Sequence, residues 1–185
     1  MKFLYQKVEE KFKNHPERLK HIYGVINMAL KLSKIYRIDE TSIEIAALLH
    51  DYTKYDSIDF HKMHMDYDTF VKYQNYPYVY HAISCANILK DEFQIDNHEI
   101  YQAIYTHVWG SPHMTLFDKV LLISDKIEET RTYDGVENLR KLAFENIDLA
   151  VIKHLEFLLE SNVGPKNEIL ENIKKLKESI ELERD

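Results

Sequence analysis

The stretch TSIEIAALLHD, residues 41–51, predicts a short helix whose apolar face ends in a histidine and an aspartate. Thr41 or Ser42 would cap the start of this helix. A row with helical spacing runs along it through Ile43, Ala46, Ala47 and His50. Because His50 lies on the face that should be buried and Asp51 follows it directly, both side chains need polar partners from elsewhere in the chain.

Helical patterns continue on both sides of this stretch. We expect further helices over residues 15–38, 77–93, 97–110, 114–129, 134–162 and 166–185. The segment 52–76 is polar and rich in Tyr, and we interpret it as a long connection with one short helix. The chain has ten His but only four Gly and four Pro, and a β-sandwich or barrel needs more of these turn residues. The sequence therefore predicts an all-α, multi-helix bundle.

The length of 185 residues predicts one domain, with a core at about residues 15–162 and a C-terminal helix, 166–185, packed on it. The last helix carries an apolar stripe that is more typical of a packing face than of a dimer seam, so a homodimer is left open. This stripe consists of Ile169, Ile173, Leu176 and Ile180.

The charge and the single cysteine exclude several classes of function. The net charge of −7 argues against broad nucleic-acid binding, which requires a basic face. The chain has no apolar run of about 18 residues, so we expect no membrane span. Cys85 is the only cysteine, which excludes an intrachain disulfide and a thiolate zinc site and favours a cytoplasmic location.

Polar residues on or beside the apolar helix faces need a common explanation. A buried carboxylate is costly without a cation, and neither Lys119 nor Lys126 shares the face of Asp125 at helical spacing. A metal is then the more economical partner, and ligands from several helices converge only inside a bundle. The sequence therefore predicts a central metal site with six candidate ligands: His21, His50, Asp51, His81, His107 and Asp125.

The alternative for any single histidine is a hydrogen-bonded core residue or a surface residue. We keep that interpretation for His15, His61, His64, His98, His113 and His154. His61 and His64 have a spacing that would suit a metal on a helix, but we expect them in a flexible polar loop.

The ordered pattern of His21, His50-Asp51 and Asp125 resembles that of the HD-domain metal-dependent phosphohydrolase superfamily, and His81 and His107 resemble its dinuclear branch. More closely, the chain resembles the bacterial HD-domain symmetrical bis(5′-nucleosyl)-tetraphosphatases. It departs from the family pattern at Ala82, Val108 and Ser124, where Gly, Thr and Ala are usual, and none of these is a candidate ligand. The matching stretches begin with RLKHIYGVINMA, IAALLHDYTKY and YHAISCANIL, and continue through AIYTHVWGSPHMTLFDKVLLISDKIEETRTYDGVENLRKLA and FENIDLA.

The resemblance implies an HD-domain bundle around two divalent metal ions, with iron favoured and Mn, Co, Ni or Zn as alternatives. Asp51 would bridge the two ions, with His21, His50 and Asp125 on one and His81 and His107 on the other. Cationic and aromatic residues in the matched stretches would contact the substrate. Lys54 and Arg131 would act as catalytic, phosphate-binding cations, and Arg18, Arg140 and Tyr133 would contribute further substrate contacts.

The activity implied by the resemblance is the symmetrical hydrolysis of diadenosine tetraphosphate (Ap4A) to two ADP. A metal-bound hydroxide would attack an inner phosphorus, and ADP or GDP would bind as product or analogue. One alternative is an HD phosphohydrolase of another nucleotide, either a nucleotidase or a phosphodiesterase. Another is a metal-stabilised nucleotide-binding module without turnover, and a metal-free helical interaction domain is the weakest.

Overall fold

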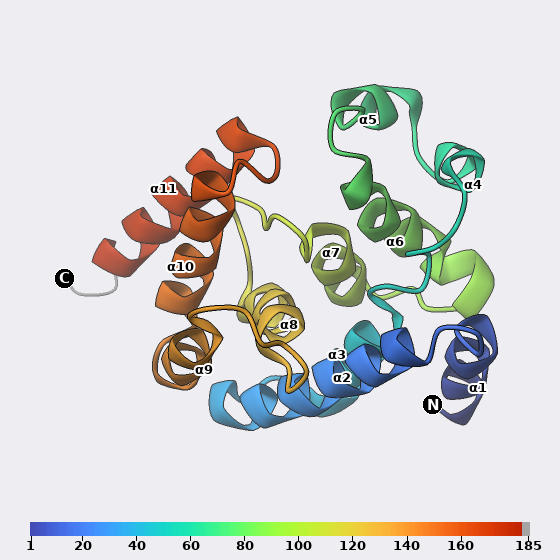
Figure 1. The fold of residues 1–185 in the computed structure, drawn as a ribbon, viewed down its shortest axis with the longest axis horizontal. Coiled ribbons are helices and arrows are strands. Elements are labelled where there is room, and N and C mark those ends of the chain that lie inside the picture. Colours follow the sequence, from blue (N-terminus) through green and yellow to red (C-terminus); the bar gives the residue numbers. More distant parts are fainter. Residues whose placement is uncertain (183–185) are drawn as a thin grey trace.

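The computed structural model describes residues 1–182, which fold entirely into helices and turns with no strand among them (Figure 1). This confirms the all-α prediction. The helices are α1 Lys2–Lys11, α2 Pro16–Tyr36, α3 Glu40–Leu49, α4 Ile58–Met63, α5 Tyr67–Lys72, the 3₁₀ turn η1 Pro77–Val79, α6 Tyr80–Phe93, α7 His98–Thr106, α8 Leu116–Ile127, α9 Val136–Glu145, α10 Ile147–Glu160 and α11 Lys166–Leu182.

The helices α2, α3, α7 and α8 surround the centre of the molecule. Figure 1 shows α7 and α8 in the middle, with α2 and α3 running beneath them, and these helices pack directly on one another. α8 starts in a reciprocal capping box of Thr115 and Asp118, and every residue from Val120 to Asp125 is buried. A helix buried on nearly all sides can present a polar side chain only to other protein groups or to a bound ligand.

The single long helix expected over 134–162 is wrong, because the chain forms α9 and α10 with a break at Asn146. Asn146 has an extended backbone, with φ −156° and ψ 105°. Its side-chain oxygen accepts a hydrogen bond from the backbone N–H of Leu149 at 3.0 Å, which caps the start of α10. The apolar periodicity continues through the break, so the cap was the only local signal of it.

The segment 52–76 holds two short helices rather than one, α4 and α5, capped by the side chains of Ser57 and Asp66. The flexible loop expected around His61 is therefore wrong. His61 lies in α4, is buried, and its Nδ1 lies 2.8 Å from the hydroxyl of Ser84. It is thus a hydrogen-bonded core histidine, as the alternative interpretation held.

Smaller differences concern the chain ends and one cap. α1 was not predicted, and the cap of α3 is Asp39, which accepts from the Ser42 N–H, instead of Thr41 or Ser42. α11 packs on α10 and buries Ile169, Ile173 and Leu176 of its stripe. The last three residues of the helix expected over 166–185 lie outside the described residues, and the division into a core and a C-terminal helix stays a prediction. No helix in residues 1–182 is long and apolar enough to cross a membrane.

We expect Asn146→Ala to destabilise the protein by about 1 kcal/mol, because it removes the side-chain cap between α9 and α10. The free energy of unfolding from urea denaturation checks this. Asn146→Asp keeps an oxygen acceptor at the same place and should lose less than half as much. Equal stabilities for the Ala variant and the unmodified protein would show that the cap does not hold the break.

Candidate metal centre

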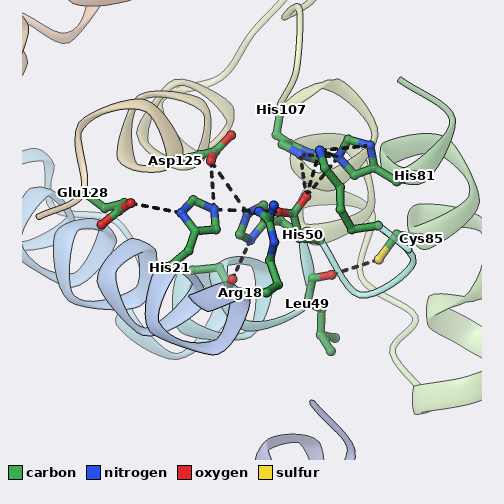
Figure 2. Close-up of polar contacts among 12 residues, drawn as sticks. Arg18, His21, Leu49, His50, His81, Cys85, His107, Asp125 and Glu128 are labelled. Carbon is green, nitrogen blue, oxygen red and sulfur yellow. Dashed lines mark hydrogen bonds and ion pairs between the residues drawn. The ribbon is translucent and has the colours of Figure 1, made fainter. Parts of the chain in front are cut away.

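The structure brings together all six side chains that the sequence singled out as candidate ligands. His21 comes from α2, His50 and Asp51 from the end of α3, His81 from α6, His107 from the end of α7, and Asp125 from α8. All of them are buried. Figure 2 shows the imidazoles of His21, His50, His81 and His107 pointing toward one another, with Asp125 beside them.

Three of the histidines are oriented by the backbone carbonyl of the residue three positions earlier in the chain. The Nδ1 of His50 lies 2.7 Å from the oxygen of Ala47, and that of His107 lies 2.7 Å from the oxygen of Ile104. His81 does the same with the oxygen of Tyr78, at 2.6 Å. Because a carbonyl can only accept, each Nδ1 carries the proton, and in the neutral ring Nε2 is left with a free lone pair.

His21 lies within a continuous helix, and its Nδ1 is held by a carboxylate instead. The Oε1 of Glu128, a fully buried residue just after α8, lies 3.0 Å from this nitrogen. Thr130 fixes that carboxylate, donating from its backbone N–H at 2.6 Å and from its hydroxyl at 2.5 Å. The imidazole of His21 therefore also directs Nε2 to the centre.

Glu128 is the functional residue that the sequence analysis missed, and Gly24 was its signal. A Cβ added at position 24 would lie 2.5 Å from the Oε2 of Glu128, so only glycine leaves room for the buried acid. A lone glycine inside an apolar helix usually has such a packing reason.

Asp51 lies at the middle of the cluster, and its two oxygens face different histidines. Its Oδ1 lies 3.0 Å from the Nε2 of His81 and 3.9 Å from that of His107. Its Oδ2 lies 3.5 Å from the Nε2 of His50 and 3.6 Å from that of His21. Asp125 joins the second group, with Oδ1 at 3.1 Å from the Nε2 of His21 and 3.9 Å from that of His50.

The donor atoms fit a divalent metal, because the lone pairs of nitrogen and oxygen atoms face one another there. Too few hydrogen atoms lie between them for these atoms to be paired by hydrogen bonds. The Nε2 atoms of His21 and His50 are buried and make no well-aligned hydrogen bond. Those of His81 and His107 are only 3.3 Å apart. Burial lowers the pKa of both these histidines, which keeps the rings neutral. Three overlapping triads of these residues have ligand atoms within 4.8 Å of one another, and imidazole with carboxylate suits Fe, Mn, Co, Ni or Zn.

Cationic side chains surround the carboxylates. The Nη1 of Arg18 lies 2.5 Å from the Oδ2 of Asp51, and the Nζ of Lys54 lies 3.6 Å from its Oδ1. Burial alone would raise the pKa of Asp51, but His50, His81 and Lys54 outweigh it and hold the pKa well below the usual range.

Asp125 has two cationic partners, one of which the sequence analysis had excluded. The Nη2 of Arg131 lies 2.9 Å from its Oδ1. The Nζ of Lys126 lies 2.5 Å from its Oδ2, so the expectation that this lysine faces elsewhere was wrong, because its long side chain bends back on the preceding residue. Burial alone would raise the pKa of Asp125, but Lys126, His21 and His50 outweigh it and hold this pKa well below its usual range.

Two residues predicted to contact the substrate lie farther from the cluster. The guanidinium of Arg140 donates to the backbone oxygens of Ile127, Glu128 and Arg131 at 2.7–2.8 Å, so it fixes the turn after α8. The hydroxyl of Tyr133 donates to the backbone oxygen of Lys126 at 2.9 Å. A cavity of about 160 Å³ opens onto the cluster, lined by Glu17, Arg18, His21, Tyr55, Glu128, Thr130 and Arg131.

We expect Glu128→Ala to weaken metal binding by about 10–100-fold, because the imidazole of His21 loses the partner that orients it. Competition with a chromophoric chelator measures the affinity. Glu129→Ala removes the neighbouring, exposed acid and is the matched control. Equal affinities for the Glu128 and Glu129 variants would contradict the role of Glu128.

Comparisons with known proteins give the family. Residues 18–130 match the HD domain family. Two similar proteins are the symmetrical bis(5′-nucleosyl)-tetraphosphatases of Bacillus subtilis (strain 168) and Staphylococcus aureus (strain NCTC 8325 / PS 47). The first is 32% identical over 148 residues, 77% of this chain and 80% of the relative. The second is 35% identical over 132 residues, 69% of this chain and 67% of the relative.

A solved structure agrees with the sequence comparisons. The predicted HD superfamily hydrolase involved in NAD metabolism from Clostridium acetobutylicum superposes with a TM-score of 0.83 at 26% identity, over 95% of this chain and 97% of the other. The resemblance seen in the sequence is thereby confirmed. With its ordered cluster of histidines and aspartates inside an all-helical bundle, the chain belongs to the HD domain family.

Proposed function

We propose that this protein is a metal-dependent hydrolase that cleaves Ap4A symmetrically into two ADP. The observation that carries the proposal is the buried cluster around Asp51, whose nitrogen and oxygen donors converge from five helices or helix ends. Relatives named symmetrical bis(5′-nucleosyl)-tetraphosphatases, 32–35% identical over most of this chain, support the choice of reaction and substrate.

We propose further that the cluster holds two divalent ions, with iron as the preferred metal. The support is that the two oxygens of Asp51 face different histidines. Its Oδ2 faces His21 and His50, while its Oδ1 faces His81 and His107. Asp51 is therefore the proposed bridge, and Asp125 completes the first group. When bound, two such ions activate water at neutral pH and polarise the phosphoryl oxygens.

The cations around the cluster would bind and orient the polyphosphate. Arg18 and Lys54 lie on the Asp51 side and Arg131 lies on the Asp125 side, so phosphates in the cavity meet positive charge from two directions. Lys54 and Arg131 would stabilise the negative charge that develops on the leaving ADP, which is the main task of protein groups in phosphoryl transfer. A symmetrical cut requires that one ADP-like half be held while the next phosphorus lies at Asp51.

Arg140, the apolar stripe of α11 and the single cysteine bear on the rest of the proposal. We assign Arg140 a positioning role for the turn that carries Arg131, because its donors are used on backbone oxygens. The homodimer stays a prediction, and the stripe does not support it, because Ile169, Ile173 and Leu176 are buried within this chain where α11 packs on α10. The cytoplasmic location is also part of the proposal, and its support is the buried free thiol of Cys85.

The decisive experiment is product analysis of Ap4A hydrolysis. The protein is loaded with Fe(II) and handled anaerobically, because air oxidises Fe(II). We expect ADP as the sole nucleotide product, about two metal ions per chain by elemental analysis, and loss of turnover on chelation. ATP plus AMP as products would contradict the symmetrical cut and would indicate another HD phosphohydrolase activity. Tight ADP binding without any turnover would identify a binding module.

We expect Arg131→Ala to lower kcat/KM by about 10²-fold while the metal content stays normal, because the guanidinium would act on the phosphates and is not a metal ligand. Lys141→Ala removes an exposed cation on α9 and is the control. Loss of metal from the Arg131 variant would show that this residue maintains the cluster itself.

A further inference from the structure

A separate cavity lies between α9 and α10, beside the turn at residues 133–135. It measures about 230 Å³, and its wall includes Tyr133, Leu139, Leu142, His154 and Phe157. Both helices pack on α8, which carries Asp125, and Figure 1 shows the three helices next to one another. Pockets that enclose a whole ligand typically measure about 300–1,000 Å³, so this one suits a single ring system that belongs to a larger ligand.

Two aromatic rings form one side of this cavity. Tyr133 and Phe157 lie nearly parallel, with ring centroids 6.1 Å apart and an interplanar angle of 21°. Both remain accessible, with 37% and 50% of their surface exposed. The hydrogen bond from the Tyr133 hydroxyl to the backbone of Lys126 fixes that ring. Flat aromatic surfaces of this kind are suited to a heterocyclic base, which gains free energy by stacking on them.

His154 supplies an unused hydrogen-bonding group at the same cavity. Its side chain is buried, with the residue 6% exposed, and its Nε2 has no hydrogen-bond partner. Burial lowers the pKa of His154 to about 3, with Lys126 and Arg131 adding to this effect and Asp125 opposing it, so the imidazole is neutral. An unpaired buried polar atom destabilises the protein, and a hydrogen bond to a ring nitrogen or amino group of a ligand would remove that cost.

The charges around the cavity disfavour a phosphate as its occupant. Among the described residues, its wall carries the acids Asp134, Glu156 and Glu160 and one cation, Lys153. Positive charge lies instead toward the cluster, where Lys126 and Arg131 both contact Asp125. From the cluster outward the protein thus presents metal ligands, then cations, then an apolar and aromatic cavity. A nucleotide presents phosphates and then a base in the same order.

We propose that this cavity is a base-binding subsite, in which the purine of an ADP unit stacks on the rings of Phe157 and Tyr133 and hydrogen-bonds to His154. The inference rests on the proposed function, since the phosphates of that unit lie at Arg131 and the cluster. It adds Phe157 and His154 to the substrate-binding residues.

The test separates recognition of the base from recognition of the phosphates. In Phe157→Ala we expect KM for Ap4A and the inhibition constant of ADP to rise about tenfold with kcat nearly unchanged. The inhibition constant of inorganic pyrophosphate, which lacks a base, should change less than twofold. Phe144→Ala removes an exposed ring of α9 outside the cavity and is the matched control. An equal rise for ADP and pyrophosphate, or none for ADP, would overturn the proposal.

A second measurement is independent of turnover. In zinc-loaded protein, which is diamagnetic, we expect ADP to shift the side-chain nitrogen signals of His154 and pyrophosphate to leave them in place. If the protein fails to hydrolyse Ap4A but shows this shift, the result supports the base subsite and contradicts the proposed function. If Ap4A hydrolysis is normal, the His154 signal does not move and KM is unchanged in Phe157→Ala, the result supports the proposed function and contradicts the subsite.

Discussion

The structure depends on the convergence of lone pairs and negative charge inside a helical bundle. Four imidazole nitrogens and two carboxylates face one another there, and all six side chains are buried, so they need cations or a metal beside them. Arg18, Lys54, Lys126 and Arg131 offset part of this charge at the edge of the cluster. Two of them, Arg18 and Arg131, also line the cavity that opens onto the cluster, so groups that balance the cluster also suit an anionic ligand.

The rings of the histidines are oriented in two ways. Helix ends leave backbone carbonyls without intrahelical partners, and His50 and His107 use such carbonyls to fix their rings. His21 lies inside a helix where the carbonyls are occupied, so it requires a partner from another part of the chain. Glu128 is this partner. Hydrogen bonds from Thr130 and Arg140 stabilise the segment after α8 that positions the acid.

Much of the site could be predicted from the sequence because its residues are costly to bury singly. His50, Asp51 and Asp125 interrupt apolar rows, and such interruptions are visible without a structure. Glu128 was missed, because its partner His21 is 107 residues away and the only local signal was the glycine at position 24. The fold class followed from helical periodicity, whereas the break at Asn146 did not, since a side-chain cap leaves the apolar pattern intact.

The close approach of Gly24 to Glu128 ties the identity of one residue to the other. A methyl group at position 24 occupies the space of the carboxylate, so the longer acid fits only opposite a hydrogen atom. Alanine at position 24 would leave room for a shorter acid at position 128, and that acid would no longer reach the ring of His21. The two positions are therefore expected to vary together among relatives, as a coupled pair with one member on α2 and the other just after α8, far apart in the chain.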